Sequence, residues 1–278
     1  VLHDRQLLRG VDVGRRIGDQ AVAQGAEPGR AVGEAARAEP PGQQRLPVVA
    51  GGQRERLVPL EIGLGQRAGG VHVDHQHAGR VVAGGAGSAT GAPLRTTFGL
   101  DLKHVQRGWF PLPELPGPGR ILASCAQYQG RLYLFSSERT DTSAGGVPFR
   151  HILDDAYCFR PRRDTGGWTG SWQKLAPMPV GRSAVASPVP VLQGRLFFWG
   201  GVDPLTALNT DPSNPDAISK DMLLYDPDRD SWQYLGRELA QRPRVTLPAV
   251  YWQGRWVYVS GEVSAGVRTD RVISIEND

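Results

Sequence analysis

Gln193-Gly194-Arg195-Leu196-Phe197-Phe198-Trp199-Gly200-Gly201 is one of three copies of the same short pattern in this 278-residue chain. The other two copies are residues 129–137 (QGRLYLFSS) and 253–261 (QGRWVYVSG). Each copy joins a polar Gln-Gly-Arg turn to an aromatic and β-branched run, which predicts a tight turn leading into a buried strand. Self-similarity at a long period is the signature of stacked supersecondary units. The three copies therefore predict a repeat architecture.

Further signals recur around each copy. A tryptophan leads a Leu- and Pro-rich stretch upstream of the copies, at Trp109, Trp172 and Trp232. An arginine follows at a spacing of 62 residues, at Arg120, Arg182 and Arg244. Downstream, another apolar run occupies residues 155–159, 222–227 and 271–275. One unit therefore contains about four short strands joined by turns, which is the content of a propeller blade.

These motifs resemble kelch repeats: an arginine before an apolar strand, Gly-Arg-Leu-Tyr, the Gly200-Gly201 pair, the Tyr225-Asp226-Pro227 turn and a closing tryptophan. The resemblance implies an all-β, kelch-type β-propeller in residues 101–278. It predicts about three recognisable four-stranded blades, at about 109–171, 172–231 and 232–278. The spacing exceeds the ~50 residues of a typical kelch unit, so the inserts are expected to be loops on one face.

Three blades do not close a ring, because propellers usually contain ~4 to 8. We therefore expect an incomplete ring and interpret the chain as a truncated member of a roughly six-bladed family. Two alternatives stay open. Residues 1–100 can contribute blades that the pattern does not reveal, or copies of the chain can associate.

Residues 1–100 differ in composition from the rest of the chain. They contain no Lys, Cys, Met, Trp, Tyr or Asn, and Phe98 is their only aromatic residue. Without large apolar side chains, little offsets the entropy lost on folding. We expect this low-complexity Gly/Ala/Arg-rich segment to be disordered or irregular, or to be an inauthentic reading frame, with a domain boundary near residue 100.

No metal site or cofactor is predicted. A histidine-rich stretch, HVDHQH, offers ligand types for zinc or copper at His72, Asp74, His75 and His77. It lies in the segment whose composition argues against a packed ligand shell. The copper-binding residues of the kelch-type enzyme galactose oxidase, which include a cysteine–tyrosine crosslink, have no counterpart in residues 109–278.

Charge and cysteine content set further bounds. The net charge of +4 is modest and the charged residues are interspersed, so no nucleic-acid partner is predicted. No apolar run reaches the ~18 residues that suggest a membrane-spanning helix, and no signal peptide is visible. Cys125 and Cys158 are expected to be free buried thiols, with a disulfide as the alternative in an oxidising compartment. The family resemblance suggests a bacterial periplasm or cytoplasm.

The most specific stretch is SGEVSAGVRTD at residues 260–270. It resembles the Gly-Glu-x-x-x-Gly-x-Arg-Thr segment of the sialic acid (N-acetylneuraminate) mutarotase family, which comprises galactose-oxidase-like kelch propellers. The resemblance extends over residues 109–278 and implies that Glu262 and Arg268 are the catalytic residues. A carboxylate can move a proton from the anomeric hydroxyl to the ring oxygen, and a guanidinium matches the fork of a sugar-acid carboxylate.

Four further residues are candidate substrate-binding groups. Arg120, Arg182 and Arg244 occupy equivalent blade positions, where a ring of inward guanidinium groups would attract an anionic sugar. The alternative is that they brace blades through carbonyls or carboxylates. Glu138 shares the register of Glu262 and is a weaker candidate, with a solvated loop as the alternative. Glu262 and Arg268 themselves can also form a purely structural ion pair.

Two function classes follow from these residues. The first is an isomerase that interconverts the anomers of a sugar or sugar acid without a cofactor. The second is a non-catalytic kelch module that binds a protein or a glycan. Propellers of one fold host both classes, so the fold alone does not choose between them.

Overall fold

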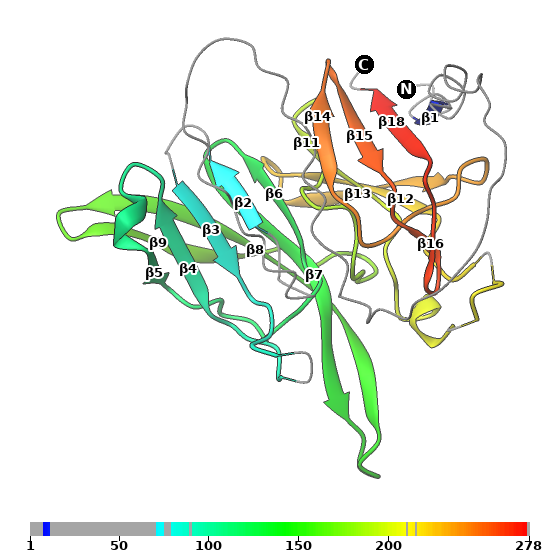
Figure 1. The fold of residues 1–278 in the computed structure, drawn as a ribbon, viewed down its shortest axis with the longest axis horizontal. Coiled ribbons are helices and arrows are strands. Elements are labelled where there is room, and N and C mark those ends of the chain that lie inside the picture. Colours follow the sequence, from blue (N-terminus) through cyan, green and yellow to red (C-terminus); the bar gives the residue numbers. More distant parts are fainter. Residues whose placement is uncertain are drawn as a thin grey trace, which may run out of the picture. The chain divides into compact units, whose positions relative to one another are not determined.

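The computed structural model of this chain describes residues 8–11, 71–74, 79–88, 91–209, 211–214 and 216–276, with the backbone alone for 8–11 and 71–74. Regular structure in these residues is almost entirely β (Figure 1). It forms four antiparallel sheets of four strands each and one two-stranded hairpin. The prediction of an all-β fold built from four-stranded blades is confirmed.

The first two sheets follow the chain order. The first contains β2 (Val71–Asp74), β3 (Gly79–Ala83), β4 (Thr97–Asp101) and β5 (Trp109–Leu112). The second contains β6 (Ser124–Tyr128), β7 (Arg131–Thr142), β8 (Pro148–Asp164) and β9 (Gly167–Leu175). Strands β7 and β8 continue as a long hairpin beyond the rest of their sheet (Figure 1). A register shift between Phe135 and Ser137 marks where this extension begins.

The third sheet also follows the chain, whereas the fourth brings together distant segments. The third contains β10 (Val191–Leu192), β11 (Arg195–Trp199), β12 (Asp221–Asp226) and β13 (Ser231–Arg237). The fourth contains β14 (Ala249–Trp252), β15 (Arg255–Val259), β18 (Val272–Glu276) and β1 (Leu8–Val11). Strand β1 pairs antiparallel with β18, so a segment near the start of the sequence provides an edge strand of the last blade.

Three small elements complete the described structure. The hairpin of β16 (Glu262–Ser264) and β17 (Val267–Arg268) lies between β15 and β18 in the sequence. Two 3-10 turns, η1 (Val105–Arg107) and η2 (Thr206–Leu208), lie in the loops before β5 and before β12. The inserts of the repeat therefore contain the hairpin that carries the most specific sequence motif.

The sheet β2–β5 reveals a fourth copy of the repeat that the sequence analysis did not recognise. Residues 79–85 read GRVVAGG, with Gly84 and Gly85 at the di-glycine position. Both have positive φ, as do Gly200 and Gly201. The copy lacks the aromatic residues that mark the others. Because β4 includes residue 100, the change in composition there does not coincide with the edge of a sheet.

The recurring tryptophans lie on the last strands of their sheets, as the closing tryptophan of a kelch repeat implies, although the proposed blades begin at these residues. Trp172 and Trp232 lie on β9 and β13, the last strands of their sheets, and do not open the next blade. Their indole Nε1 atoms donate backwards, Trp172 to Pro113 O at 2.8 Å and Trp232 to Ala176 O at 3.1 Å. The first strands of these sheets begin at Ser124, Val191 and Ala249, which is 15, 19 and 17 residues after Trp109, Trp172 and Trp232.

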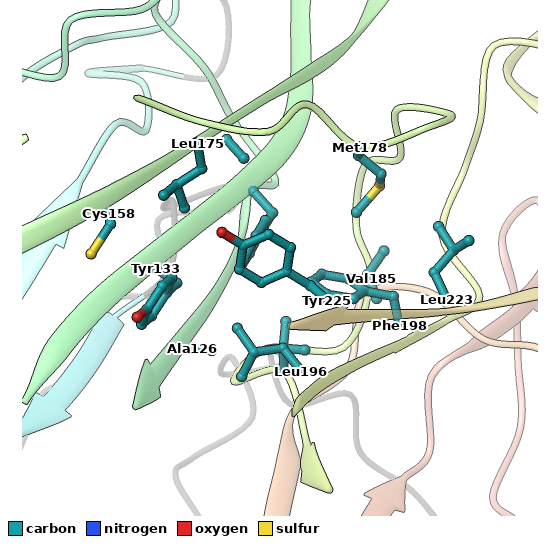
Figure 2. Close-up of a cluster of buried hydrophobic side chains, with 13 residues drawn as sticks. Ala126, Tyr133, Cys158, Leu175, Met178, Val185, Leu196, Phe198, Leu223 and Tyr225 are labelled. Atoms are coloured by element: carbon teal, nitrogen blue, oxygen red, sulfur yellow. The ribbon is translucent and has the colours of Figure 1, made fainter. Parts of the chain in front are cut away.

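The core lies between neighbouring blades. One buried cluster joins the sheet β6–β9 to the sheet β10–β13, and Figure 2 shows Tyr133, Tyr225 and Phe198 among its side chains. Separate buried clusters join β2–β5 to β6–β9 and β10–β13 to β14–β15–β18. Face-to-face packing of the sheets explains why strands flanked by polar turns are rich in aromatic residues on both sides.

Cys125 and Cys158 belong to two of these clusters. Both thiols are buried and free, and burial raises the pKa of each. Sγ of Cys125 lies 3.2 Å from Oγ of Ser187 in the next blade. The two cysteines therefore fill space between sheets.

Close backbone contacts hold the inner ends of the blades together. A Cβ at Gly200 would lie 2.2 Å from the carbonyl oxygen of Arg244, so only glycine fits there without movement. At the equivalent position, Ser136 adopts a φ of 50° and accepts a hydrogen bond at its Oγ from the amide of Arg182, at 2.5 Å. The serine that departs from the kelch di-glycine thus makes its own contact with the next blade.

A ladder of backbone hydrogen bonds links three blades in series. Leu122, Ala184 and Thr246 are 62 residues apart and have φ values of 56°, 58° and 56°. The amide of Ala184 donates to the carbonyl of Leu122, and the amide of Thr246 donates to the carbonyl of Ala184, both at 2.9 Å. The positive φ of Ala184 and Thr246 orients the amide of each residue toward a carbonyl of the preceding blade.

Candidate active site

A cavity of about 610 Å³ is lined by residues of three consecutive blades. Its lining includes the three ladder residues, Leu122, Ala184 and Thr246, so it lies where the hydrogen-bond ladder joins the three blades. This volume falls in the range of small-molecule sites, ~300 to 1,000 Å³. The charged residues that line it are Glu138, Arg150, Glu262 and Arg268.

The repeat places one side chain per blade beside this cavity. In each blade, the residue that follows the repeated arginine forms an isolated antiparallel β-bridge with the residue that follows the di-glycine position. The bridged pairs are Ile121 with Glu138, Ser183 with Val202 and Val245 with Glu262. Three equivalent positions therefore carry a glutamate, a valine and a glutamate. The two carboxylates are repeat-related, and the blade between them is apolar at this point.

Glu262 and Arg268 are opposite each other in the register of the β16–β17 hairpin. Nη2 of Arg268 lies 3.4 Å from Oε1 of Glu262, and neither side chain forms another hydrogen bond with the residues that the structure describes. The exposed fractions are 28% for the Glu262 side chain and 56% for Arg268. The turn that brings them together contains Gly266, which has a φ of 68°. Both groups thus face the cavity with unused hydrogen-bonding capacity.

Glu138 is held much more tightly. Its Oε2 accepts hydrogen bonds from Nε of Arg150 at 3.1 Å, from Nη2 of Arg150, and from Oγ of Ser183 at 2.8 Å. The Glu138 side chain is only 6% exposed, whereas Arg150 is 42% exposed. One oxygen of the carboxylate therefore accepts three hydrogen bonds from protein donors, and the guanidinium is the part of this pair that reaches solvent.

The long hairpin explains how Arg150 arrives beside Glu138. Thr140 pairs with Arg150 and Glu138 pairs with Ile152, so Glu138 and Arg150 lie diagonally on one face of β7 and β8. Thr140 lines the cavity beside them. Sequence reasoning selected Glu138 and missed Arg150. The sequence signal for Arg150 was the length of the insert after Glu138. An insert of this length can form a hairpin, which brings later residues back beside Glu138 on the same face of the sheet.

The three repeated arginines do not line the cavity. Arg120, Arg182 and Arg244 are buried, with exposed fractions of 0%, 1% and 3%. Nη1 of each donates to the carbonyl of its own blade's di-glycine position, at Ser136, Gly200 and Ser260. These contacts are those of internal braces, so we do not propose these arginines as substrate-binding residues.

The three buried arginines differ in their second hydrogen-bond acceptor. Arg120 makes a bidentate pair with Asp155, at 2.8 and 2.7 Å, and lies 5.3 Å from the ring centroid of Tyr157. Burial, followed by the charge of Asp155, raises the pKa of Tyr157 to about 12. Arg182 donates to the carbonyl of Asp221 at 2.7 Å, and Arg244 to that of Arg271 at 2.5 Å. Burial lowers the pKa of Arg182 and Arg244.

The described residues contain no group of three or more metal-ligating side chains arranged to hold an ion. The side chains of His72, Asp74, His75 and His77 lie outside the described residues. None of the helices in the described part of the chain is long and apolar enough to cross a membrane.

The fold and the cavity define a kelch-type β-propeller chain with two carboxylate–guanidinium pairs at one cavity. No protein-family model matches the chain. Among curated proteins it is similar to an N-acetylneuraminate epimerase of Brucella melitensis biotype 1, with 27% identity over 62% of this chain and 49% of that protein. A protein of the same name from Escherichia coli O1:K1 / APEC is 23% identical over 64% of this chain and 52% of that protein.

Two solved structures share the fold. The structure of YjhT matches with a TM-score of 0.57 and 21% identity, covering 76% of this chain and 63% of that one. A fungal alcohol oxidase of the AA5 family, in complex with copper, matches with a TM-score of 0.50 and 12% identity, covering 72% of this chain and 38% of that one. The relatives named N-acetylneuraminate epimerase confirm the resemblance to the sialic acid mutarotase family, and the two solved structures support the β-propeller fold. The chain spans about half the length of the curated relatives it matches.

Proposed function

We propose that the cavity interconverts the anomers of a sugar acid of the N-acetylneuraminate class. In this proposal Glu262 is the general acid and base, and Arg268 binds the substrate carboxylate. The observation that carries it is the Glu262–Arg268 pair, placed on one hairpin at the cavity with its carboxylate only lightly engaged.

The chemistry requires these two groups to be neighbours. In this class of sugar acid the anomeric carbon carries both the hydroxyl that loses a proton and the carboxylate. A group that binds the carboxylate must therefore lie beside the group that moves the proton. The 3.4 Å contact between Arg268 and Glu262 supplies this adjacency. The guanidinium retains donors that can form two parallel hydrogen bonds with a carboxylate.

The proposed reaction transfers a single proton, which Glu262 takes from the substrate and then returns to it. Glu262 removes the proton from the anomeric hydroxyl as a carbonyl forms at the anomeric carbon and the bond to the ring oxygen breaks. The same carboxyl group then gives the proton to the ring oxygen. Rotation of the open-chain carbonyl and the reverse sequence close the ring on the opposite face. Neither oxidation nor a second substrate is needed.

The similarity to proteins named N-acetylneuraminate epimerase supports this proposal. The relatives named N-acetylneuraminate epimerase are matched over about half of their length. The alternative function, a non-catalytic module that binds a protein or glycan, predicts no rate effect on anomerisation.

The test is proton NMR of anomer equilibration with N-acetylneuraminate and purified protein. We expect faster equilibration with the wild type and a rate about 10²- to 10⁴-fold lower for Glu262→Gln, the range associated with general acid–base groups. Arg268→Ala should mainly raise KM. Glu114→Gln is the matched control, because Glu114 is 59% exposed and does not line the cavity. Equal rates with folded wild type and Glu262→Gln would reject the assigned role.

A further inference from the structure

The second carboxylate–guanidinium pair at the cavity has no role in the proton transfer proposed above. Glu138 occupies the same repeat position as Glu262, yet it accepts two hydrogen bonds from Arg150 and one from Ser183. Oε2 is therefore a poor proton acceptor, because it already accepts three hydrogen bonds. Its effect is to fix the orientation of Arg150.

Arg150 retains donor capacity toward the cavity. Its Nε and Nη2 bind Glu138, and Nη2 also lies 3.4 Å from Oγ of Ser183. Its Nη1 has no hydrogen-bond partner among the residues that the structure describes. The side chain is 42% exposed and lines the cavity. An ordered guanidinium with an unused edge is a preorganised donor, so binding a ligand there costs little side-chain entropy.

A second hollow adjoins Arg150. It has a volume of about 600 Å³, and its lining is mainly apolar. Its apolar residues come from the β7–β8 hairpin and from the loop that contains η2, and they are Phe149, Ile152, Pro204, Ala207 and Leu208. Because Arg150 lines both hollows, this residue lies next to an apolar surface. A ligand group that combines an acceptor oxygen with a methyl group fits this boundary.

Arg150 and Arg268 differ in how closely a glutamate compensates their charge, and this difference suggests different ligand groups for the two arginines. The Arg150 pair with Glu138 is neutral as a unit, and the carboxylate is nearly buried. The remaining donors of Arg150 therefore suit a neutral acceptor better than a second carboxylate. Arg268 has a single contact of 3.4 Å with Glu262 and is 56% exposed, so its charge is less closely compensated than that of Arg150. The substrate carboxylate is thus expected at Arg268 and a neutral oxygen at Arg150.

We propose that Arg150 determines specificity by donating a hydrogen bond to the acyl carbonyl of a substrate acetamido group. The acyl methyl group lies against the adjoining apolar surface, and Glu138 and Ser183 act as positioning residues for the guanidinium. This inference rests on the proposed function, because it names the part of the sugar acid that the same site reads.

The test compares two sugar acids that differ only at this group. The first is N-acetylneuraminate, and the second is the nonulosonic acid with a hydroxyl in place of the acetamido group. Anomer equilibration is measured for wild type, Arg150→Lys, Arg150→Gln and the control Arg139→Gln. Arg139 lies on the same hairpin, on the opposite face from Glu138, and pairs with Asp141. Arg150→Lys keeps a cation beside Glu138, so it preserves the buried pair while removing the planar fork.

We expect Arg150→Lys to raise KM for N-acetylneuraminate by about tenfold with little change in kcat, because a hydrogen bond from a charged group is lost. KM for the hydroxyl analogue should change less than threefold, and Arg139→Gln should leave both unchanged. Equal losses for the two sugars would overturn the proposal, since Arg150 would then contact a part common to both, such as the glycerol side chain.

A binding measurement separates this inference from the proposed function. In saturation-transfer NMR, the acetamido methyl protons of bound N-acetylneuraminate should receive strong saturation from wild type and much less from both Arg150 variants. If wild type binds the sugar in this way without accelerating equilibration, the catalytic proposal fails and the specificity proposal stands. Absence of methyl saturation in wild type, or its persistence in Arg150→Lys and Arg150→Gln, would overturn the specificity proposal.

Discussion

The blade arginines and the cavity arginines are the same side chain in two different settings. Arg120, Arg182 and Arg244 are at most 3% exposed, and each donates to a carbonyl of its own blade. Arg150 and Arg268 are 42% and 56% exposed, and each is paired with a glutamate at the cavity. The first set uses its donors to hold strands together, whereas the second set keeps donors available.

The difference follows from where the residues lie in the repeat. A residue that recurs in every unit serves a need that every blade has, such as satisfying inner carbonyl groups. Residues in the inserts differ between blades and can therefore serve one ligand. Arg150 comes from the extension of β7 and β8, and Arg268 from the β16–β17 hairpin. Variants of both sets can break or sharpen this distinction.

The largest loss of stability is expected for Arg120→Ala. It removes a bidentate partner from Asp155, whose side chain is only 15% exposed, and leaves that carboxylate without its cation. Breaking a buried pair by removing one partner costs about 3–5 kcal/mol. Urea unfolding measures this as a lower midpoint at an unchanged slope.

Arg120→Met combined with Asp155→Leu is the control for this prediction. The double variant leaves no unpaired carboxylate, so it should be more stable than Arg120→Ala. A double variant as unstable as the single one would show that the contacts of Arg120 with backbone carbonyls, and not its ion pair, dominate.

A smaller loss, of about 1.5–3 kcal/mol, is expected for Arg182→Ala. Arg182 has no bidentate carboxylate, and its main partners are the carbonyl groups of Gly200 and Asp221. Burial already lowers the pKa of this arginine, so part of its hydrogen-bonding gain is offset by desolvation. The same urea measurement applies. A loss larger than that of Arg120→Ala would contradict the ranking of the two braces.

The smallest effect is expected at Arg163, an arginine in neither set. It is 51% exposed and lies 4.0 Å from Asp101, so Arg163→Ala should change stability by less than about 0.5 kcal/mol.

Asp101, the partner of Arg163, allows a prediction about pH. A hydrogen bond with His104 lowers the pKa of Asp101 to about 2. Because this value lies below the ordinary one, Asp101 adds stability above about pH 4 that is lost as the pH falls toward 2. Asp101→Asn should flatten the acid limb of a stability–pH curve, and Arg163→Ala should not.

Aromatic residues decided how much of the fold could be predicted. Three units were recognised through Tyr133, Phe197 and Trp256, which lie one or two residues after Gly-Arg in otherwise similar runs. The unit at 79–85 has only valine and alanine at those positions, so the same backbone pattern carried too little signal. Pairing of β1 with β18 was not predictable, because it depends on a four-residue strand far away in the sequence.

The candidate site also contains residues that could be predicted from the sequence and one residue that could not. The placement of Glu262 and Arg268 on one hairpin agrees with their spacing around Gly266, while their roles stay a proposal. The location of Arg150 depends on the register of an insert and on the shift between Phe135 and Ser137, which no local pattern specifies. Its assignment needed the three-dimensional position of Glu138, twelve residues earlier in the chain.

The hydrogen-bond ladder through Leu122, Ala184 and Thr246 has an evolutionary consequence. Each step offers the next blade the same acceptor and receives the same donor, at a fixed distance of 62 residues along the gene product. A duplicated or deleted unit would therefore join its neighbours through bonds of unchanged geometry. Such modules can be gained, lost or permuted by recombination without a new inner contact having to arise, while each insert diverges independently toward its own ligand.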